Sequence, residues 1–104
     1  MKINFEDFKI FCITPGYPDS NKANSYVNAI QIVFDYLNIQ ADIFELSDYE
    51  EIQNLHSALN DKNCSVYLDL HDFVINRKQK SYLEGGFINA AINYFNDYYT
   101  RKKR

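Results

Sequence analysis

The sequence predicts a single α/β domain of three layers, in which a mixed sheet of four to five strands lies between helices. Short apolar runs of strand length alternate with longer segments in which apolar residues recur every three or four positions. Turn-forming Pro15, Gly16 and Pro18 separate the first apolar run from the first such segment. The predicted order over residues 1–104 is strand, helix, strand, helix, β-hairpin and helix, which places helices on both faces of the sheet.

The first half of the chain contains two predicted strands, at residues 8–14 and 41–46, with a helix between them. This helix ends near Leu37, because Asn38 tolerates the left-handed conformation that closes a helix. Phe34 is expected to be a core residue, since it lies centrally on the apolar stripe of the helix. The stripe consists of Ala23, Tyr26, Val27, Ile30, Val33, Phe34 and Leu37.

The second half begins with a predicted helix over residues 48–60, which Ser47 and Glu50 cap reciprocally. Residues 64–70 predict a third strand, and residues 73–76 and 81–83 predict a hairpin. Gly85 and Gly86 then precede the last helix, and we find no internal repeat. Phe95 is expected to be a second core residue, on the apolar stripe of this last helix. The stripe consists of Phe87, Ile88, Ala91, Ile92, Phe95 and Tyr99.

The charge distribution argues against nucleic acid, and the partner that we expect is a protein or a larger assembly. Four of the eleven basic residues lie at positions 101–104, so residues 1–100 carry seven basic and fourteen acidic groups. A nucleic-acid surface needs a basic face to neutralise phosphates. The four terminal basic residues are expected to be solvated at a helix end, where positive charge is favourable.

The cysteines and the N-terminus predict a cytoplasmic protein, in the host cytoplasm if the source is viral. Cys12 and Cys64 lie in apolar runs and are expected to be buried free thiols. The sequence has no signal peptide pattern and no apolar run of membrane-spanning length. Frequent Asn, Lys, Ile and Tyr are typical of an AT-rich genome, such as that of a low-GC bacterium, a phage or a large virus.

Three short motifs resemble the glutaredoxin branch of the thioredoxin-fold superfamily. Residues 15–20 are similar to the active loop, residues 73–76 to the hairpin, and residues 84–87 to the Gly-Gly-aromatic start of the last helix. The resemblance implies a thioredoxin-like fold and a ligand-binding edge where the family holds glutathione. His71 would lie where the family has a loop proline. The implied ligand-binding residues are Tyr17, Ser20, His71, Gly85, Gly86 and Phe87.

Tyr17 and Ser20 replace the two active-loop cysteines, so the resemblance implies a member without the redox reaction. We therefore expect a redox-inactive binding or structural module without a cofactor, with glutathione bound weakly at most, and favour this role over an enzyme. Asp69, His71 and Asp72 do not predict a metal site, because alternate strand positions face opposite ways. Two alternatives stay open. One is a glutathione-binding enzyme, and the other is a small acidic immunity or antitoxin-type protein that neutralises a basic toxin.

Overall fold

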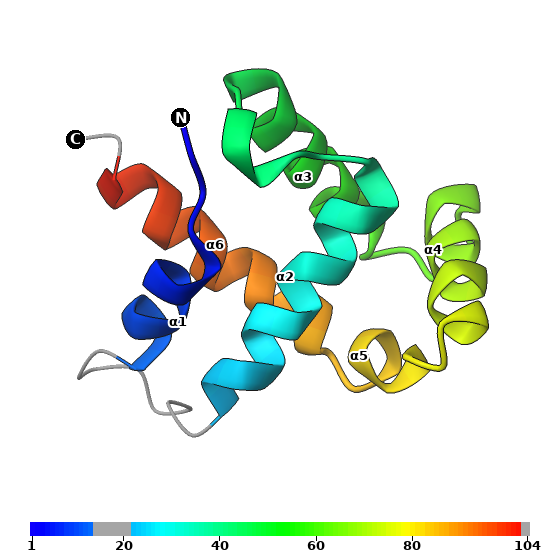
Figure 1. The fold of residues 1–104 in the computed structure, drawn as a ribbon. Coiled ribbons are helices and arrows are strands. Elements are labelled where there is room, and N and C mark those ends of the chain that lie inside the picture. The colour runs from blue at the N-terminus through cyan, green and yellow to red at the C-terminus, as the bar shows by residue number, and fades with distance from the viewer. Residues whose placement is uncertain (14–21, 103–104) are drawn as a thin grey trace.

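The fold is built from helices (Figure 1). The computed structural model describes residues 1–13 and 22–102, and this part of the chain contains no strand. The predicted α/β fold, with its thioredoxin-like sheet, is therefore wrong. The elements are α1 (Phe5–Ile13), α2 (Ala23–Leu37), the 3-10 helix η2 (Ala41–Ile43), α3 (Leu46–Ala58), α4 (Ser65–Asn76), α5 (Lys80–Glu84) and α6 (Phe87–Lys102).

The predicted strands are helical because their buried residues are spaced by four positions rather than two. Phe8 and Cys12 are the buried residues of α1, and Leu70 and Val74 are those of α4. The third strand and the first hairpin strand merge into α4, while residues 41–43 form η2 and residues 80–84 form α5. A short apolar run fits both periodicities, so its length alone does not decide between strand and helix.

The three predicted helices are confirmed as α2, α3 and α6, with shifted boundaries. Asn38 adopts the expected left-handed conformation, with φ of 57°, and its N–H donates to carbonyls of the last turn of α2. The capping box of α3 uses Glu45 instead of Ser47. The Glu45 N–H donates to Asp48 Oδ2 at 2.8 Å, and the Glu45 side chain accepts from the Asp48 N–H in return.

An aromatic cluster fills the centre of the molecule, where α2 and α6 cross (Figure 1). The fully buried ring of Phe95 meets the rings of Phe8, Phe34 and Phe44 edge-on, with centroids 5.7–5.8 Å apart. Edge-to-face pairs of this kind add to the free energy gained from burying the rings. The prediction that Phe34 and Phe95 are core residues is confirmed.

The two central helices share a short internal repeat, which the sequence reading missed. Residues 26–29 (YVNA) of α2 correspond to residues 87–90 (FINA) of α6, and Phe34 corresponds to Phe95 at the same spacing. Corresponding rings lie next to each other, with centroids 6.1 Å apart for Tyr26 and Phe87 and 5.7 Å apart for Phe34 and Phe95. The central helix pair is therefore joined through equivalent positions.

The remaining helices pack around this pair at different places. α1 contacts α2 and α6 on the side where the C-terminal end of α6 lies, whereas α4 and α5 lie on the opposite side (Figure 1). α3 contacts α2, α4 and α6. Within the described residues, no helix combines the length and the apolar character that a membrane crossing requires.

Candidate functional site

The structure brings together only part of the predicted ligand-binding edge. Tyr17 and Ser20 lie outside the described residues. His71 lies in the interior of α4 rather than at a strand end, and its Nε2 is 2.9 Å from Glu84 Oε2 of α5. This contact places His71 close to the glycine pair that separates α5 from α6. Within the described ranges, no three His, Cys, Asp or Glu side chains are grouped to hold a metal ion.

A small cleft of about 170 Å³ lies beside the glycine pair. Position 86 favours glycine, because residues with a side chain rarely adopt a φ of 81°. Glu84 is hydrogen-bonded to His71, and this bond lowers the pKa of the carboxyl group. Phe87 is half-buried against Tyr26 and therefore serves the core. The cleft is lined by Leu59, Lys62, Tyr67, Leu83, Glu84, Gly86 and Asn89.

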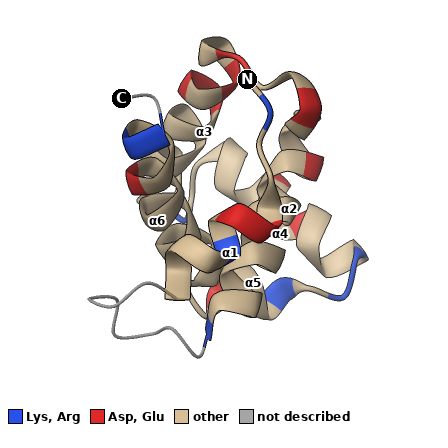
Figure 2. Cartoon of the chain, turned by 60° about the vertical axis from the view of Figure 1, so that its left-hand side comes forward, with Lys and Arg blue, Asp and Glu red and all other residues tan. Residues whose placement is uncertain are grey.

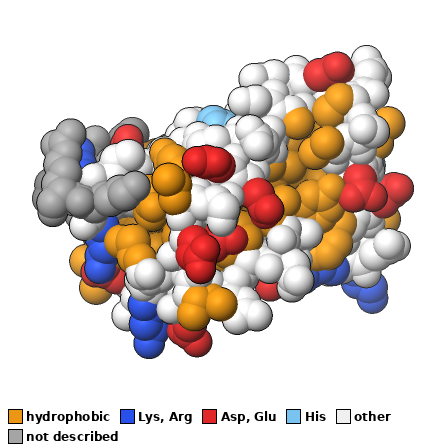
Figure 3. Space-filling view, turned by 90° about the horizontal axis from the view of Figure 1, so that it is seen from above, with side chains coloured by type: hydrophobic (Ala, Val, Ile, Leu, Met, Phe, Trp, Pro, Cys, Tyr) orange, Lys and Arg blue, Asp and Glu red, His pale blue; other side chains and the backbone are white. Residues whose placement is uncertain are grey.

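A larger apolar depression lies between α2, α3 and α4. We call it the α2–α3–α4 groove. Its volume is about 270 Å³, and it adjoins a hollow of about 340 Å³ through the shared residues Tyr36 and Val66. Figure 3 shows hydrophobic side chains gathered on the side of the molecule where α4 lies, with Asp and Glu side chains among them and Lys or Arg side chains at one edge. The groove and hollow are lined by Tyr36, Leu37, Asn54, Leu55, Ser65, Val66 and Asp69.

Hydrogen bonds hold the walls of the groove in place. The Tyr36 hydroxyl of α2 donates to Asp69 Oδ2 of α4 at 2.6 Å, and the Tyr36 ring meets the Phe73 ring edge-on at 5.3 Å. Burial of the hydroxyl, and to a smaller extent the Asp69 carboxylate, raise the pKa of Tyr36 to about 12. At the start of α4, the Cys64 thiol accepts from the Tyr67 N–H at 3.3 Å and donates to the Ala58 carbonyl at 3.2 Å. The α4 wall is therefore fixed to both α2 and α3.

The three helices that form the groove are acidic without exception. They contain six acidic residues and neither Lys nor Arg: Asp35, Asp48, Glu50, Glu51, Asp69 and Asp72. Glu51 precedes Asn54 and Leu55 by one turn of α3 and so lies on the same face. In Figure 2, Lys and Arg are found on α1, around α5 and at the end of α6, whereas α3 carries only Asp and Glu. Arg77, which follows α4 directly, pairs with Asp35 at 2.9 Å, and the other five carboxylates leave the surroundings of the groove acidic.

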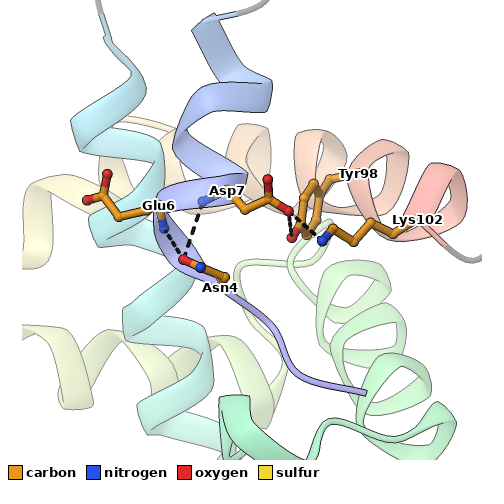
Figure 4. Close-up of polar contacts among 5 residues, drawn as sticks. All are labelled: Asn4, Glu6, Asp7, Tyr98 and Lys102. Carbon is orange, nitrogen blue, oxygen red and sulfur yellow. Dashed lines mark hydrogen bonds and ion pairs between the residues drawn. The ribbon is translucent and has the colours of Figure 1, made fainter.

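The opposite side of the molecule carries basic and acidic side chains together. A second cleft of about 310 Å³ lies between α1 and the end of α6; we call it the α1–α6 end. The Asp7 carboxylate accepts from the Tyr98 hydroxyl at 2.9 Å and pairs with Lys102 at 2.6 Å (Figure 4). Both contacts lower the pKa of Asp7. The cleft is lined by Asp7, Ile10, Phe11, Tyr98, Arg101 and Lys102.

The sequence prediction missed both the groove and the α1–α6 end. One signal was readable, since no Lys or Arg occurs between Lys22 and Lys62. Comparisons with protein-family models, with curated proteins and with solved structures found no match. What the chain binds is therefore inferred from the shape and charge of its own surface.

Proposed function

We propose that this chain is a protein-binding module that recognises a basic partner through the α2–α3–α4 groove. The observation that carries the proposal is the apolar groove within three helices that have six carboxylates and neither Lys nor Arg. Lys and Arg of a partner would pair with carboxylates such as Glu51 and Asp69, while an apolar side chain fills the groove. Complementary charge increases the association rate and disfavours acidic partners.

The dimensions of the groove favour a protein partner over a small molecule. The groove of about 270 Å³ continues into the adjoining hollow of about 340 Å³, so it offers an extended surface rather than a single enclosed pocket. Helix-in-groove recognition uses a few apolar anchors of an amphipathic helix, laid into a hydrophobic surface depression. A basic amphipathic segment is the partner that fits both the shape and the charge.

The two alternatives raised by the sequence differ in how well they fit the groove. A basic toxin, neutralised by an acidic immunity-type protein, is one partner of the proposed chemistry, so this alternative remains within the proposal. The glutathione-binding enzyme depended on a thioredoxin-like sheet, which the described residues do not contain. The glutathione alternative therefore loses its structural basis.

The experiment measures binding of a synthetic helical peptide of about 15 residues, with Leu and Phe on one face and Lys and Arg on the others. Val66 lines the groove, and Leu68, two residues further, lies on the opposite side of α4. We expect Val66→Lys to weaken binding at least about tenfold, because it removes an apolar contact and adds like charge. The matched control Leu68→Lys should change the affinity less than about threefold.

Fluorescence anisotropy of the labelled peptide gives the affinities, and amide chemical shifts locate the contact. Binding should weaken as ionic strength rises, because salt screens exposed charges. Equal loss of affinity in both Lys variants, or shift changes confined to other helices, would contradict the proposed site.

A further inference from the structure

We propose that the partner of the groove includes a second copy of this chain, whose α1–α6 end docks in the α2–α3–α4 groove. This inference rests on the proposed function, because it names an occupant for the same groove. It concerns two surfaces of the molecule that differ in charge but share an exposed apolar centre.

The α1–α6 end carries the apolar side chains that such a contact needs. Ile10 and Ile13 lie three positions apart on α1, and 64% and 48% of their surfaces are exposed. Exposed large apolar side chains that lie side by side are typical of interaction sites. Ile10 lines the cleft between α1 and α6, so it can serve as the apolar anchor.

Basic side chains surround this anchor. Arg101 and Lys102 line the same cleft as Ile10, and Lys9 precedes it on α1. The guanidinium of Arg101 lies over the Phe11 ring, 5.3 Å from its centroid, which holds the charge at the exposed rim of the cleft. Lys102 is already paired with Asp7, so the α1–α6 end offers an apolar anchor with Lys9 and Arg101 as the cations for a carboxylate of the groove.

The positions of the two surfaces determine the kind of assembly. α1 and the C-terminal end of α6 lie on one side of the molecule, and α4 lies on the other (Figure 1). A contact between two different surfaces is head-to-tail and leaves one groove and one end unoccupied in every pair. Such contacts continue into rings or open chains instead of closing as a twofold dimer.

Sedimentation of the purified chain tests self-association directly. Between about 10 μM and about 1 mM protein, we expect the average mass to rise above the 12.3 kDa of one chain and to pass two chains. Raising the salt from about 50 mM to about 500 mM should return the mass to that of one chain, because both surfaces are exposed and charged. A chain that remains monomeric at the highest concentration, or stops at two copies, overturns the inference.

A mixing experiment separates head-to-tail contact from any other. Val66→Lys disables the groove and Ile10→Asp disables the α1–α6 end, so each variant alone should remain monomeric. An equimolar mixture retains one intact groove and one intact end, and should form dimers and nothing larger. A monomeric mixture, or association of either variant alone, contradicts the proposed contact.

Two controls match these variants in exposure and chemistry. Leu68→Lys lies on the opposite side of α4, and Ile43→Asp replaces a side chain 61% exposed on η2; both should associate as the unaltered chain does. The basic peptide that tests the proposed function should compete with self-association. If the peptide binds the groove while the chain stays monomeric, this inference fails and the proposed function stands. If neither is observed, both fail.

Discussion

Tyr36 is the residue on which the groove depends most. Its ring lines both the groove and the adjoining hollow, and its hydroxyl donates to Asp69 across the gap between α2 and α4. The donated hydrogen bond exists only while the phenol is protonated. Burial of the ring and the neighbouring carboxylate both favour that protonated state.

We predict that Tyr36 makes the stability of the fold sensitive to alkaline pH. The pKa of Tyr36 rises from an ordinary 10.0 to about 12 in the folded state. A group with a raised folded pKa contributes stability that is fully present below its unfolded pKa and is lost as pH rises through the folded pKa. The free energy of unfolding should therefore fall between pH 10 and 12, and fall less in Tyr36→Phe.

Urea unfolding at a series of pH values measures this difference. Burial and the Asp7 carboxylate raise the pKa of Tyr98 as well, so part of the alkaline loss should persist in Tyr36→Phe. Asp69→Asn should lower the Tyr36 pKa, because it removes the negative charge that opposes ionisation. Identical pH profiles for the unaltered chain and Tyr36→Phe would show that Tyr36 titrates alike in both states.

At the scale of elements, the N-cap of α4 is a cysteine, which is an unusual residue in that position. Ser, Thr, Asp and Asn are the preferred N-cap residues, whereas α4 begins after Cys64. The thiol accepts from the third residue of the helix and donates to the last residue of α3. Cys64 is a free thiol, so this link between α3 and α4 rests on hydrogen bonds.

We predict that Cys64→Ala lowers the free energy of unfolding by about 0.5–1 kcal/mol, since it removes the cap of α4. Cys64→Ser should lose less, because a hydroxyl is a stronger acceptor at the same position. Urea titrations measure the difference, and hydrogen exchange should show faster exchange of α4 amides in the alanine variant. Equal stability of the alanine and serine variants would show that the side chain at position 64 does not cap α4.

The sequence predicted elements where single side chains mark a helix end. Asn38 closes α2 as expected, and Gly86, with its positive φ, directly precedes α6. The sequence wrongly predicted two strands within residues 64–76, because the polar pair His71–Asp72 resembles the end of a strand. His71 instead pairs with Glu84 on the surface of a continuous helix. The acidic character of residues 23–61 could be read from the sequence, but the groove requires α2, α3 and α4 to be neighbours, which no local pattern specifies.

The whole molecule shares one hydrophobic core, to which every helix among the described residues contributes. α1 adds Phe8, α3 adds Ile52, α4 adds Leu70 and α5 adds Leu83, all against the central pair of α2 and α6. With the core shared in this way, the loss of one helix exposes apolar surface on several others. The fold therefore has no part that can unfold without weakening the rest.

We predict that the chain unfolds in one cooperative transition. Far-ultraviolet circular dichroism follows the helices, and tyrosine absorbance follows the aromatic core. Both should give the same urea midpoint, with a slope of about 1–3 kcal/mol/M for a domain of this size. A separate early loss of helical signal would show that α4 and α5 form a second unit.

The absence of lysine from the groove also determines which reagents can detect a bound partner. Trypsin leaves the chain from Ala23 to Lys62 as a single peptide, because this stretch has no internal cleavage site. Amine-directed cross-linkers and lysine acetylation can modify every lysine of the protein without touching α2, α3 or α4. A partner in the groove would contribute the amines itself, so carboxylate-to-amine coupling is the chemistry that would trap it there.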